Sequence, residues 1–259
     1  MGIVKKFRIT KFKNQKPLIS IKNISLSFKK KHLILDNISL DISKGQVIGL
    51  LGPNGAGKSS MMNLIIGLIK PNYGSIMIDG EDVAHYPIYE RTKKFKISFV
   101  PQSGGYFADL STEENLTAIS EIILNDKKIG KYKVEKLISR FELDAVRKVE
   151  AKFLSGGMKR RLVISMALLG EPEILLLDEP LAALDPQTIQ MLQSIIINLQ
   201  AEDNLTIIIT DHQARDLLVV CDKAIILSNS KIVAEGTPNE LINNEIATKH
   251  YFGQNFKFK

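Results

Sequence analysis

Residue types suited to phosphate chemistry recur in four short segments of this 259-residue chain. The segments are GPNGAGKS at residues 52–59, LSGG at 154–157, ILLLDE at 174–179 and TDH at 210–212. Glycine-rich loops and lysine bind phosphate oxygens, whereas carboxylates and histidine hold metal ions or move protons. Their order along one chain predicts a site that binds a nucleoside triphosphate and hydrolyses it.

Residues 52–59 fit the pattern G-x-x-x-x-G-K-[ST] of a phosphate-binding loop. Glycine allows successive backbone N–H groups to curve around an anion, and the N-terminus of the following helix adds its positive dipole. We expect Lys58 to bridge the β- and γ-phosphates and the Ser59 hydroxyl to ligate Mg²⁺. The residues predicted to contact the nucleotide here are Gly52, Pro53, Asn54, Gly55, Ala56, Gly57, Lys58, Ser59 and Ser60.

Two adjacent acids follow a run of four apolar residues at 174–177. Such a run is typical of a buried central strand, which delivers Asp178 to the carboxyl edge of a sheet, where ligands of open α/β folds bind. Asp178 is then placed to hold the magnesium shell, and Glu179 to polarise the attacking water. An exposed turn that carries two acids is the alternative interpretation.

The pattern around these segments predicts an α/β fold interrupted by helices. Alternation of apolar and polar residues at 18–25 and 35–42 is typical of half-buried antiparallel strands. From about residue 103 to 161 only helices are expected, the first opened by a capping box at Ser111. Further strands are expected at 46–51, 75–79, 97–100, 173–178, 205–210, 223–227 and 231–234, and further helices at 59–69, 87–95, 132–141, 157–169, 187–199 and from Thr237.

Length and composition limit the class of protein. The chain is long enough to bury a full core, and no apolar run approaches the roughly 18 residues of a membrane span. Its single cysteine, Cys221, excludes an internal disulfide. Residues 1–31 hold ten of the Lys and Arg and no acid, so the net charge of +7 belongs to one end. We expect residues 1–17 to be a basic extension, lying near an anionic membrane or simply solvated, and no nucleic-acid partner.

The segment LSGG at 154–157 resembles the LSGGQ signature of ATP-binding cassette (ABC) ATPases, and the likeness extends from about Leu18 to Phe256. The resemblance implies a RecA-like core with an antiparallel β subdomain and a helical subdomain. It makes residues 18–259 one domain, with the helical subdomain at about 103–161. It also implies ATP and Mg²⁺ as cofactors. In that family the active form is a head-to-tail homodimer, in which Ser155, Gly156 and Gly157 would bind the γ-phosphate held by the other subunit.

Further residues match elements of the ABC family one by one. Gln102 matches the Q-loop glutamine, which completes the magnesium and water shell, and Asp185 matches the D-loop, which contacts the opposite subunit. His212 matches the switch histidine, which hydrogen-bonds the γ-phosphate and orients Glu179. Phe28 stands where the family usually has a tyrosine that stacks on adenine. Phenylalanine keeps the π-face, although ordinary packing on a sheet is the alternative for this ring.

Two departures from the family pattern lie beside these motifs. Met158 replaces the usual Gln after the signature glycines, and we expect this change to tune closure of the dimer without abolishing it. Residues 182–183 are both Ala, so the Ser common in D-loops is missing.

Finer features resemble the ATPases of lipopolysaccharide export systems. The likeness lies at residues 209–212, 220–224, 235–238 and in the tail at 251–256. It implies an ATPase that is peripheral on the cytoplasmic face of the inner membrane and drives lipopolysaccharide extraction and export. Two integral membrane permease subunits would dock between Gln102 and Leu110, and membrane contact would come only through them. Ala108 and Asp109 replace the basic residues usual at that docking segment.

Other functions remain open at this point. Branched-chain amino acid importers have similar ATPases with a related tail, so an importer is the alternative. A nucleic-acid-binding ATPase would use the basic N-terminus and show DNA- or RNA-stimulated hydrolysis with steep salt dependence. A module that binds ATP without hydrolysing it is disfavoured because Lys58, Asp178, Glu179 and His212 are all present.

Overall fold

Two β-sheets of different construction form the centre of the computed structural model, which describes residues 16–28 and 32–253. The larger sheet has six strands in the order β10-β9-β3-β8-β7-β6. Five of them run parallel, and β10 pairs antiparallel with β9 at one edge. Their bounds are β3 (Val47–Leu51), β6 (Ile97–Val100), β7 (Ile174–Asp178), β8 (Thr206–Thr210), β9 (Lys223–Ser228) and β10 (Lys231–Gly236).

The smaller sheet is antiparallel, with four strands in the order β2-β1-β4-β5. Ile19 of β1 lies opposite Ile42 of β2 on one side and Ile78 of β4 on the other, and all three side chains are buried. The strand bounds are β1 (Ile19–Phe28), β2 (His32–Ile42), β4 (Tyr73–Ile78) and β5 (Glu81–Asp82). The predicted α/β cassette fold, with its antiparallel sheet, is therefore confirmed. Most of the proposed N-terminal extension, residues 1–15, lies outside the described residues.

Every residue of β3, β7 and β8 is buried, as expected for central parallel strands covered on both faces. Branched aliphatic residues fill these strands because they pack well on a pleated, buried surface. In the register of β7 and β8, Asp178 lies opposite Thr210. The carboxyl ends of the two strands therefore bring an acid and a hydroxyl side by side.

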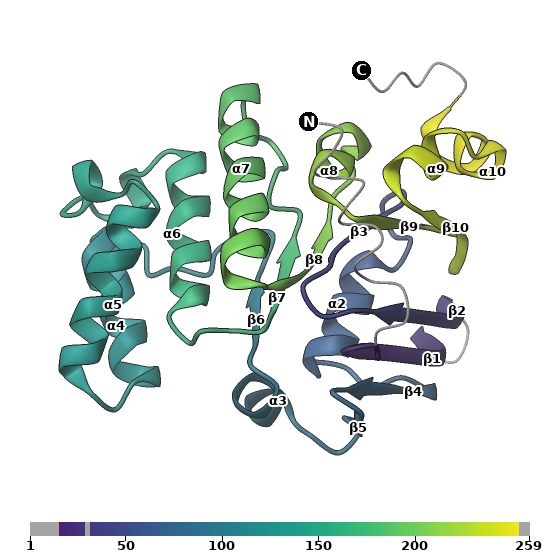
Figure 1. Ribbon diagram of the computed structural model, residues 1–259, viewed down its shortest axis with the longest axis horizontal. Coiled ribbons are helices and arrows are strands. Elements are labelled where there is room, and N and C mark those ends of the chain that lie inside the picture. Colours follow the sequence, from purple (N-terminus) through teal and green to yellow (C-terminus); the bar gives the residue numbers. More distant parts are fainter. Residues whose placement is uncertain (1–15, 29–31, 254–259) are drawn as a thin grey trace.

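Helices cover the sheets, and α4, α5 and α6 form a separate group on the left of Figure 1, which we call the helical lobe. None of the helices in the described part of the chain is long and apolar enough to cross a membrane. The bounds are α2 (Lys58–Ile66), α3 (Ile88–Lys94), α4 (Thr112–Ile123), α5 (Lys127–Arg140), α6 (Gly156–Leu168), α7 (Pro186–Asp203), α8 (Ala214–Val220), α9 (Pro238–Ile242) and α10 (Glu245–Ala247). Short 3₁₀ turns lie at Asp144–Val146 and Ala151–Phe153, and a π-helical turn at Thr248–Phe252.

The positions at which the helices begin and end are set by capping residues more than by the spacing of apolar residues. The capping boxes predicted at Ser111 and Thr237 both form. Helix α2 ends before the predicted residue 69, because Gly67 turns left-handed at φ 90°. Helix α5 begins five residues before the predicted 132, because the Asp126 carboxylate accepts hydrogen bonds from the backbone N–H groups of Lys128 and Ile129.

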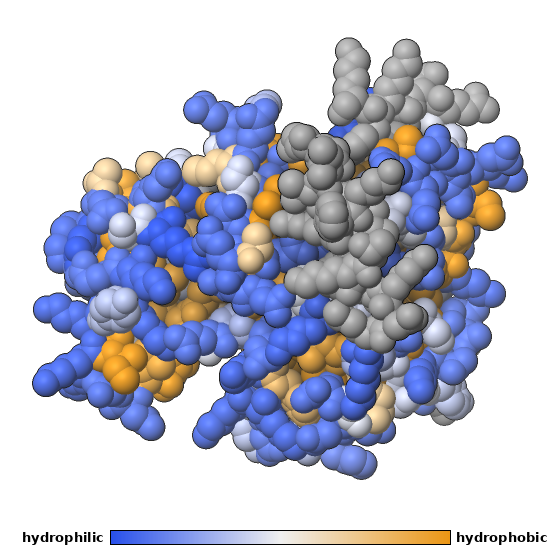
Figure 2. Space-filling view, viewed as in Figure 1, coloured by the Kyte–Doolittle hydropathy of each residue, from blue (hydrophilic) through white to orange (hydrophobic). Residues whose placement is uncertain are grey.

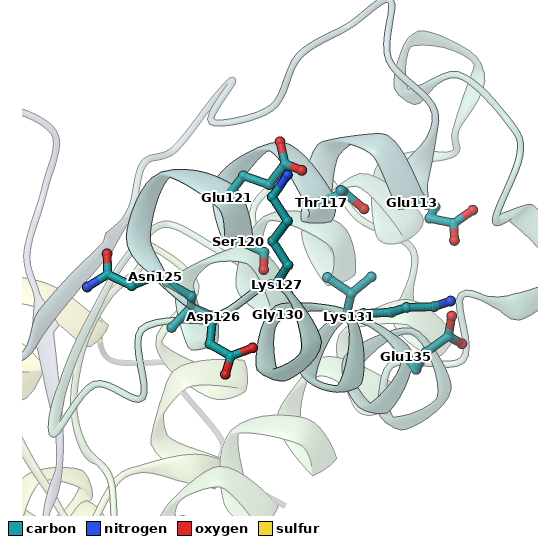
Figure 3. A pocket seen from close by; sticks show the side chains of 12 residues that line it. Glu113, Thr117, Ser120, Glu121, Asn125, Asp126, Lys127, Gly130, Lys131 and Glu135 are labelled. Atoms are coloured by element: carbon teal, nitrogen blue, oxygen red, sulfur yellow. The ribbon is translucent and has the colours of Figure 1, made fainter.

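A cavity of about 510 Å³ lies between α4 and α5 (Figure 3). Its wall alternates acids and lysines, among them Glu121, Asp126 and Lys131. Glu113 at its rim is paired with Arg147 and Lys148, and these hydrogen bonds lower the pKa of that carboxyl to about 2. No lining residue belongs to the four motifs, so this cavity is separate from the predicted site.

Arg91 of α3 fastens the end of α2. Its buried guanidinium donates hydrogen bonds to the carbonyls of Leu64 at 2.8 Å, Ile65 at 3.0 Å and Tyr86 at 2.8 Å. The first two are carbonyls at the C-terminal end of the helix, which have no partner within it. Arg91 therefore holds the helix that follows the phosphate loop against α3.

Replacing Arg91 with Met should lower the free energy of unfolding by about 2 kcal/mol or more, because buried carbonyls lose their donor. Urea denaturation monitored by circular dichroism measures the change. Lys93→Met on the exposed face of the same helix is the control and should stay within about 0.5 kcal/mol of the wild type. Equal stability of the two variants would contradict the role given to Arg91.

Candidate active site

The phosphate loop connects β3 to α2 in a conformation that requires glycine at two positions. Gly52 has φ 151°, and a Cβ there would lie 2.3 Å from the Leu227 carbonyl oxygen. Gly57 has φ 100°, and a Cβ there would lie 2.7 Å from Leu35 Cδ2. The nine-residue helix α2 begins directly afterwards at Lys58, so its free N–H groups face the loop.

Lys58 lies inside the loop, with 5% of its surface exposed. Its ammonium donates hydrogen bonds to the carbonyls of Gly52 at 2.8 Å and Pro53 at 3.2 Å. Burial lowers the pKa of Lys58, and the charges of Glu179, Asp178 and Asp211 oppose that change. Pro53, Asn54 and Gly55 are exposed, and Ser60 is half-buried, so the outer rim of the loop is accessible.

The Asp178 carboxylate joins the loop to the end of the sheet. Its Oδ1 accepts hydrogen bonds from the Ser59 hydroxyl at 3.2 Å and from the Thr210 hydroxyl at 2.5 Å. Asp178 is buried, with 8% exposed, so it is not part of an exposed turn. Two of the three residues predicted to hold the metal, Ser59 and Asp178, are thus in direct contact.

Glu179 has a left-handed backbone, with φ 47°. For a residue with a Cβ this conformation costs roughly 1–2 kcal/mol. The Glu179 N–H donates to both the carbonyl of Thr210 at 3.1 Å and its hydroxyl at 3.0 Å, which holds the peptide in place. Strained backbone of this kind often accompanies functional sites. Thr210 was not predicted as a site residue, and its register opposite Asp178 is the signal that identifies it.

Two other predicted site residues, Gln102 and His212, meet the Glu179 side chain. The Gln102 amide donates to Glu179 Oε2 at 2.7 Å, and His212 Nδ1 lies 3.6 Å from the same oxygen. The Glu179 carboxylate therefore lies between the side chains of Gln102 and His212. The His212 side chain is 46% exposed, so its ring is open to a ligand.

The neighbours of His212 hold its loop in place. Asp211 is fully buried, its Oδ2 has no hydrogen-bond partner, and burial raises the pKa of its carboxyl. The Tyr251 hydroxyl donates to the His212 carbonyl at 2.8 Å, and burial raises the pKa of Tyr251 to about 12. Tyr251 entered the sequence analysis only as part of the tail motif, whose last residues, 254–256, lie outside the described residues.

The signature and D-loop residues contact each other rather than the phosphate loop. Ser155 caps α6 by accepting a hydrogen bond from the Met158 N–H, and Gly157 faces Thr188, because a Cβ there would lie 2.5 Å from its methyl group. Asp185 caps α7 through Thr188. Within the described residues no hydrogen bond links 155–157 to 52–59, and β6 and β7 separate α6 from α2 in Figure 1.

Gly156 and Phe28 complete the set of predicted residues. Gly156 is the first residue of α6, and a Cβ there would lie 3.2 Å from Leu184 Cδ2. Phe28 ends β1 opposite His32, and its ring is 51% exposed.

Thr210→Val tests the link between the hydroxyl and the two acids. It should slow the ATP hydrolysis implied by the motifs by roughly tenfold or more in kcat, because Glu179 N–H and Asp178 lose a partner at the reacting end. The control is Thr206→Val, at the other end of the same strand, where the hydroxyl accepts only from the Gly45 N–H. Similar kcat values for the two variants in a phosphate-release assay would contradict the role of Thr210.

Comparison with known proteins identifies the family of the chain. The chain matches the family model described as ABC transporter over residues 35–182. It is 36% identical over 241 residues to the lipopolysaccharide export system ATP-binding protein LptB of Haemophilus influenzae, covering 93% of this chain and 99% of the relative. Identity to LptB of Escherichia coli K12 is 34% over 242 residues, with 92% and 98% covered.

Solved structures give the same fold. A nucleotide-free ATP-binding cassette from an ABC transporter superposes with TM-score 0.83 at 24% identity, covering 92% of this chain and 100% of that one. A dimeric, post-hydrolysis cassette bound to ADP and phosphate superposes with TM-score 0.76 at 26% identity, covering 85% and 98%. From its family match and its relatives, the chain belongs to the ABC transporter family as an ATP-binding subunit that hydrolyses ATP.

Proposed function

We propose that this ATPase powers lipopolysaccharide export as a homodimer bound to two permease subunits on the cytoplasmic face of the inner membrane. The observation that carries the proposal is the similarity to LptB over 92–93% of the chain at 34–36% identity. The geometry around Glu179 supports turnover of ATP, because Gln102 and His212 lie at hydrogen-bond or ion-pair distance from its carboxylate.

The nucleotide site is composite in this proposal. One chain supplies the loop at residues 52–59, and its partner supplies Ser155, Gly156 and Gly157. Helix α6 begins at Gly156 and is 13 residues long, so its N-terminus offers free N–H groups and a positive dipole to a γ-phosphate. Asp185 sits beside this signature through Thr188, at the face that a partner chain would meet. Support comes from a similar cassette that was solved as a dimer.

The donor set fits a magnesium ion. The Ser59 hydroxyl and the Asp178 carboxylate lie 3.2 Å apart, and Mg²⁺ prefers such oxygen ligands together with phosphate oxygens and water. Gln102, held at Glu179, would complete that shell. When bound, the ion would neutralise charge that develops on the phosphates. Lys58 would turn from the carbonyls of its own loop to the phosphates.

Hydrolysis rests on the position of the Glu179 carboxylate. Gln102 and His212 fix the Glu179 side chain, while Thr210 fixes its backbone. The Glu179 carboxylate can then accept a hydrogen bond from a water molecule that lies in line with the γ-phosphate. His212 would contact the γ-phosphate with its exposed ring. Phe28, which is 51% exposed, would stack on adenine.

Glu179→Gln should bind ATP, close and stay closed, because the amide cannot polarise water while all phosphate contacts remain. Size-exclusion chromatography with ATP should show a dimer for this variant. Lys58→Ala, which lacks the phosphate contact, should remain monomeric in the same column. A Glu179→Gln protein that elutes only as monomer at saturating ATP would count against closure of a dimer around ATP.

The segment after Gln102 is suited to dock a membrane partner. The buried Asn115 side chain accepts from the Phe107 N–H at 2.7 Å and donates to the carbonyls of Phe107, Leu110 and Ser111. It fixes the loop while the Phe107 ring remains 47% exposed. Figure 2 shows a notch between the helical lobe and the part that contains α3, where a permease helix could insert.

The Asp109 carboxylate, one of the departures from the export pattern, pairs with Lys152 at 3.0 Å. The docking loop therefore presents an internal ion pair in place of free arginines. This observation favours the second candidate, the ATPase of a branched-chain amino acid importer. Tagged protein pulled from solubilised native membranes and analysed by mass spectrometry separates the two. Permeases with a large periplasmic domain would support export, and compact permeases with an amino-acid-binding protein would support import.

Phe107→Ala should reduce recovery of the permeases in that pull-down by at least about tenfold, because an exposed aromatic anchor contributes about 1.4 kcal/mol or more. Basal ATP hydrolysis of the isolated protein should not change. Tyr132→Ala, an exposed aromatic on α5, is the control and should recover permeases normally. Full recovery with Phe107→Ala would place the docking surface elsewhere.

A further inference from the structure

Arg160 connects the helical lobe to the hydrolytic end of the sheet. It is the fifth residue of α6, one turn beyond the signature. Its Nη1 donates to the Pro101 carbonyl at 3.2 Å, and its Nη2 donates to the Glu179 carbonyl at 3.3 Å. One guanidinium therefore holds the peptide before Gln102 and the peptide of Glu179 itself.

The next residue shows what a purely structural arginine does on this helix. Arg161 Nη1 donates to the carbonyls of Phe141 at 3.0 Å and Glu142 at 3.2 Å, which end α5 and begin the following turn. These contacts of Arg161, and a further one at 3.4 Å to the Glu142 carboxylate, stay on the side of the helical lobe. Arg160 points the other way, across the boundary between the lobe and the core.

The carbonyl that Arg160 holds belongs to the strained residue. Glu179 has φ 47°, a conformation that persists only when the surroundings enforce it. Thr210 holds the N–H side of this residue, and Arg160 holds its carbonyl. Because the two contacts lie on opposite sides of one residue, a shift of α6 would be felt at the Glu179 side chain.

Charge strengthens the connection. Burial lowers the pKa of Arg160, while the charges of Asp211, Glu179 and Asp178 oppose that change. Asp211 is fully buried, and its Oδ2 has no hydrogen-bond partner. A fixed guanidinium is the side chain best suited to this place, since it stays charged and makes two directed hydrogen bonds at once.

We propose that Arg160 is a positioning residue for hydrolysis, which couples the signature helix to the placement of Gln102 and Glu179. When residues 155–157 engage ATP, α6 and its guanidinium set the two peptides that carry the water-orienting side chains. The inference rests on ATP hydrolysis through Glu179, as proposed above, and holds for either transported molecule.

Steady-state ATP hydrolysis by the full chain tests the proposal with Arg160→Met, Arg160→Lys and the neighbouring Lys159→Met. Arg160→Met should lower kcat roughly 10- to 100-fold with KM for ATP within about threefold, because placement is lost while phosphate contacts remain. Arg160→Lys keeps the charge but cannot reach both carbonyls, so its kcat should lie between that of the wild type and that of Arg160→Met. Lys159 donates only to the Lys152 carbonyl, within the lobe, and Lys159→Met should match the wild type.

A second readout separates positioning from folding or dimer closure. In the Glu179→Gln background, Arg160→Met should still elute as an ATP-bound dimer, because closure precedes the step that Arg160 serves. The proposal is overturned if kcat of Arg160→Met stays within twofold of the wild type. It is equally overturned if KM rises as much as kcat falls, or if Arg160→Lys behaves like Arg160→Met. A wild-type chain without ATPase activity would instead refute the proposed function itself.

Discussion

The site depends on the concentration of negative charge at one edge of the sheet. The carboxyl ends of β7 and β8 bring Asp178, Glu179 and Asp211 together, and two of these acids are buried. Buried carboxylates are costly unless hydrogen bonds or cations compensate them. Lys58 from the phosphate loop and Arg160 from the signature helix each interact with all three acids. The same three acids thus attract a cation from the phosphate loop and a cation from the helical lobe.

The close approach of these acids is accompanied by strain in the backbone of Glu179. Asp178 and Glu179 follow one another in the chain, but their side chains point to different places. The Asp178 carboxylate contacts Ser59 in the phosphate loop, and the Glu179 carboxylate contacts Gln102. The left-handed turn at Glu179 separates them. The hydrogen bond that the Glu179 N–H donates to Thr210 and the one that its carbonyl accepts from Arg160 offset the cost of this conformation on either side. The backbone of Glu179 is therefore held by contacts from β8 and α6, which come from different parts of the sequence.

Short-range signals in the sequence predicted much of this arrangement. The glycine spacing at 52–57 predicted a loop in which Gly52 and Gly57 adopt positive φ, and the apolar run before Asp178 predicted the buried strand β7. The contacts of Thr210, Arg160 and Tyr251 could not be predicted, because they depend on strand register and on how the lobe packs against the core. The early start of α5 was missed because hydrophobic period says little about an Asp cap. The signature and the phosphate loop lie apart within one chain, so the contacts of a single chain could not predict that they meet across a dimer.

Mixing two inactive variants tests the composite site most directly. Lys58→Ala disables the phosphate loop, and Ser155→Arg disables the signature with a bulky cation at the N-terminus of α6. In a mixed dimer, one site combines both defects and the other is intact. Equal mixtures should therefore recover up to about a quarter of wild-type ATPase activity, since half of the dimers are mixed and each has one working site. Activity no higher than that of either variant alone, with mixed dimers confirmed by native mass spectrometry, would contradict a site shared between two chains.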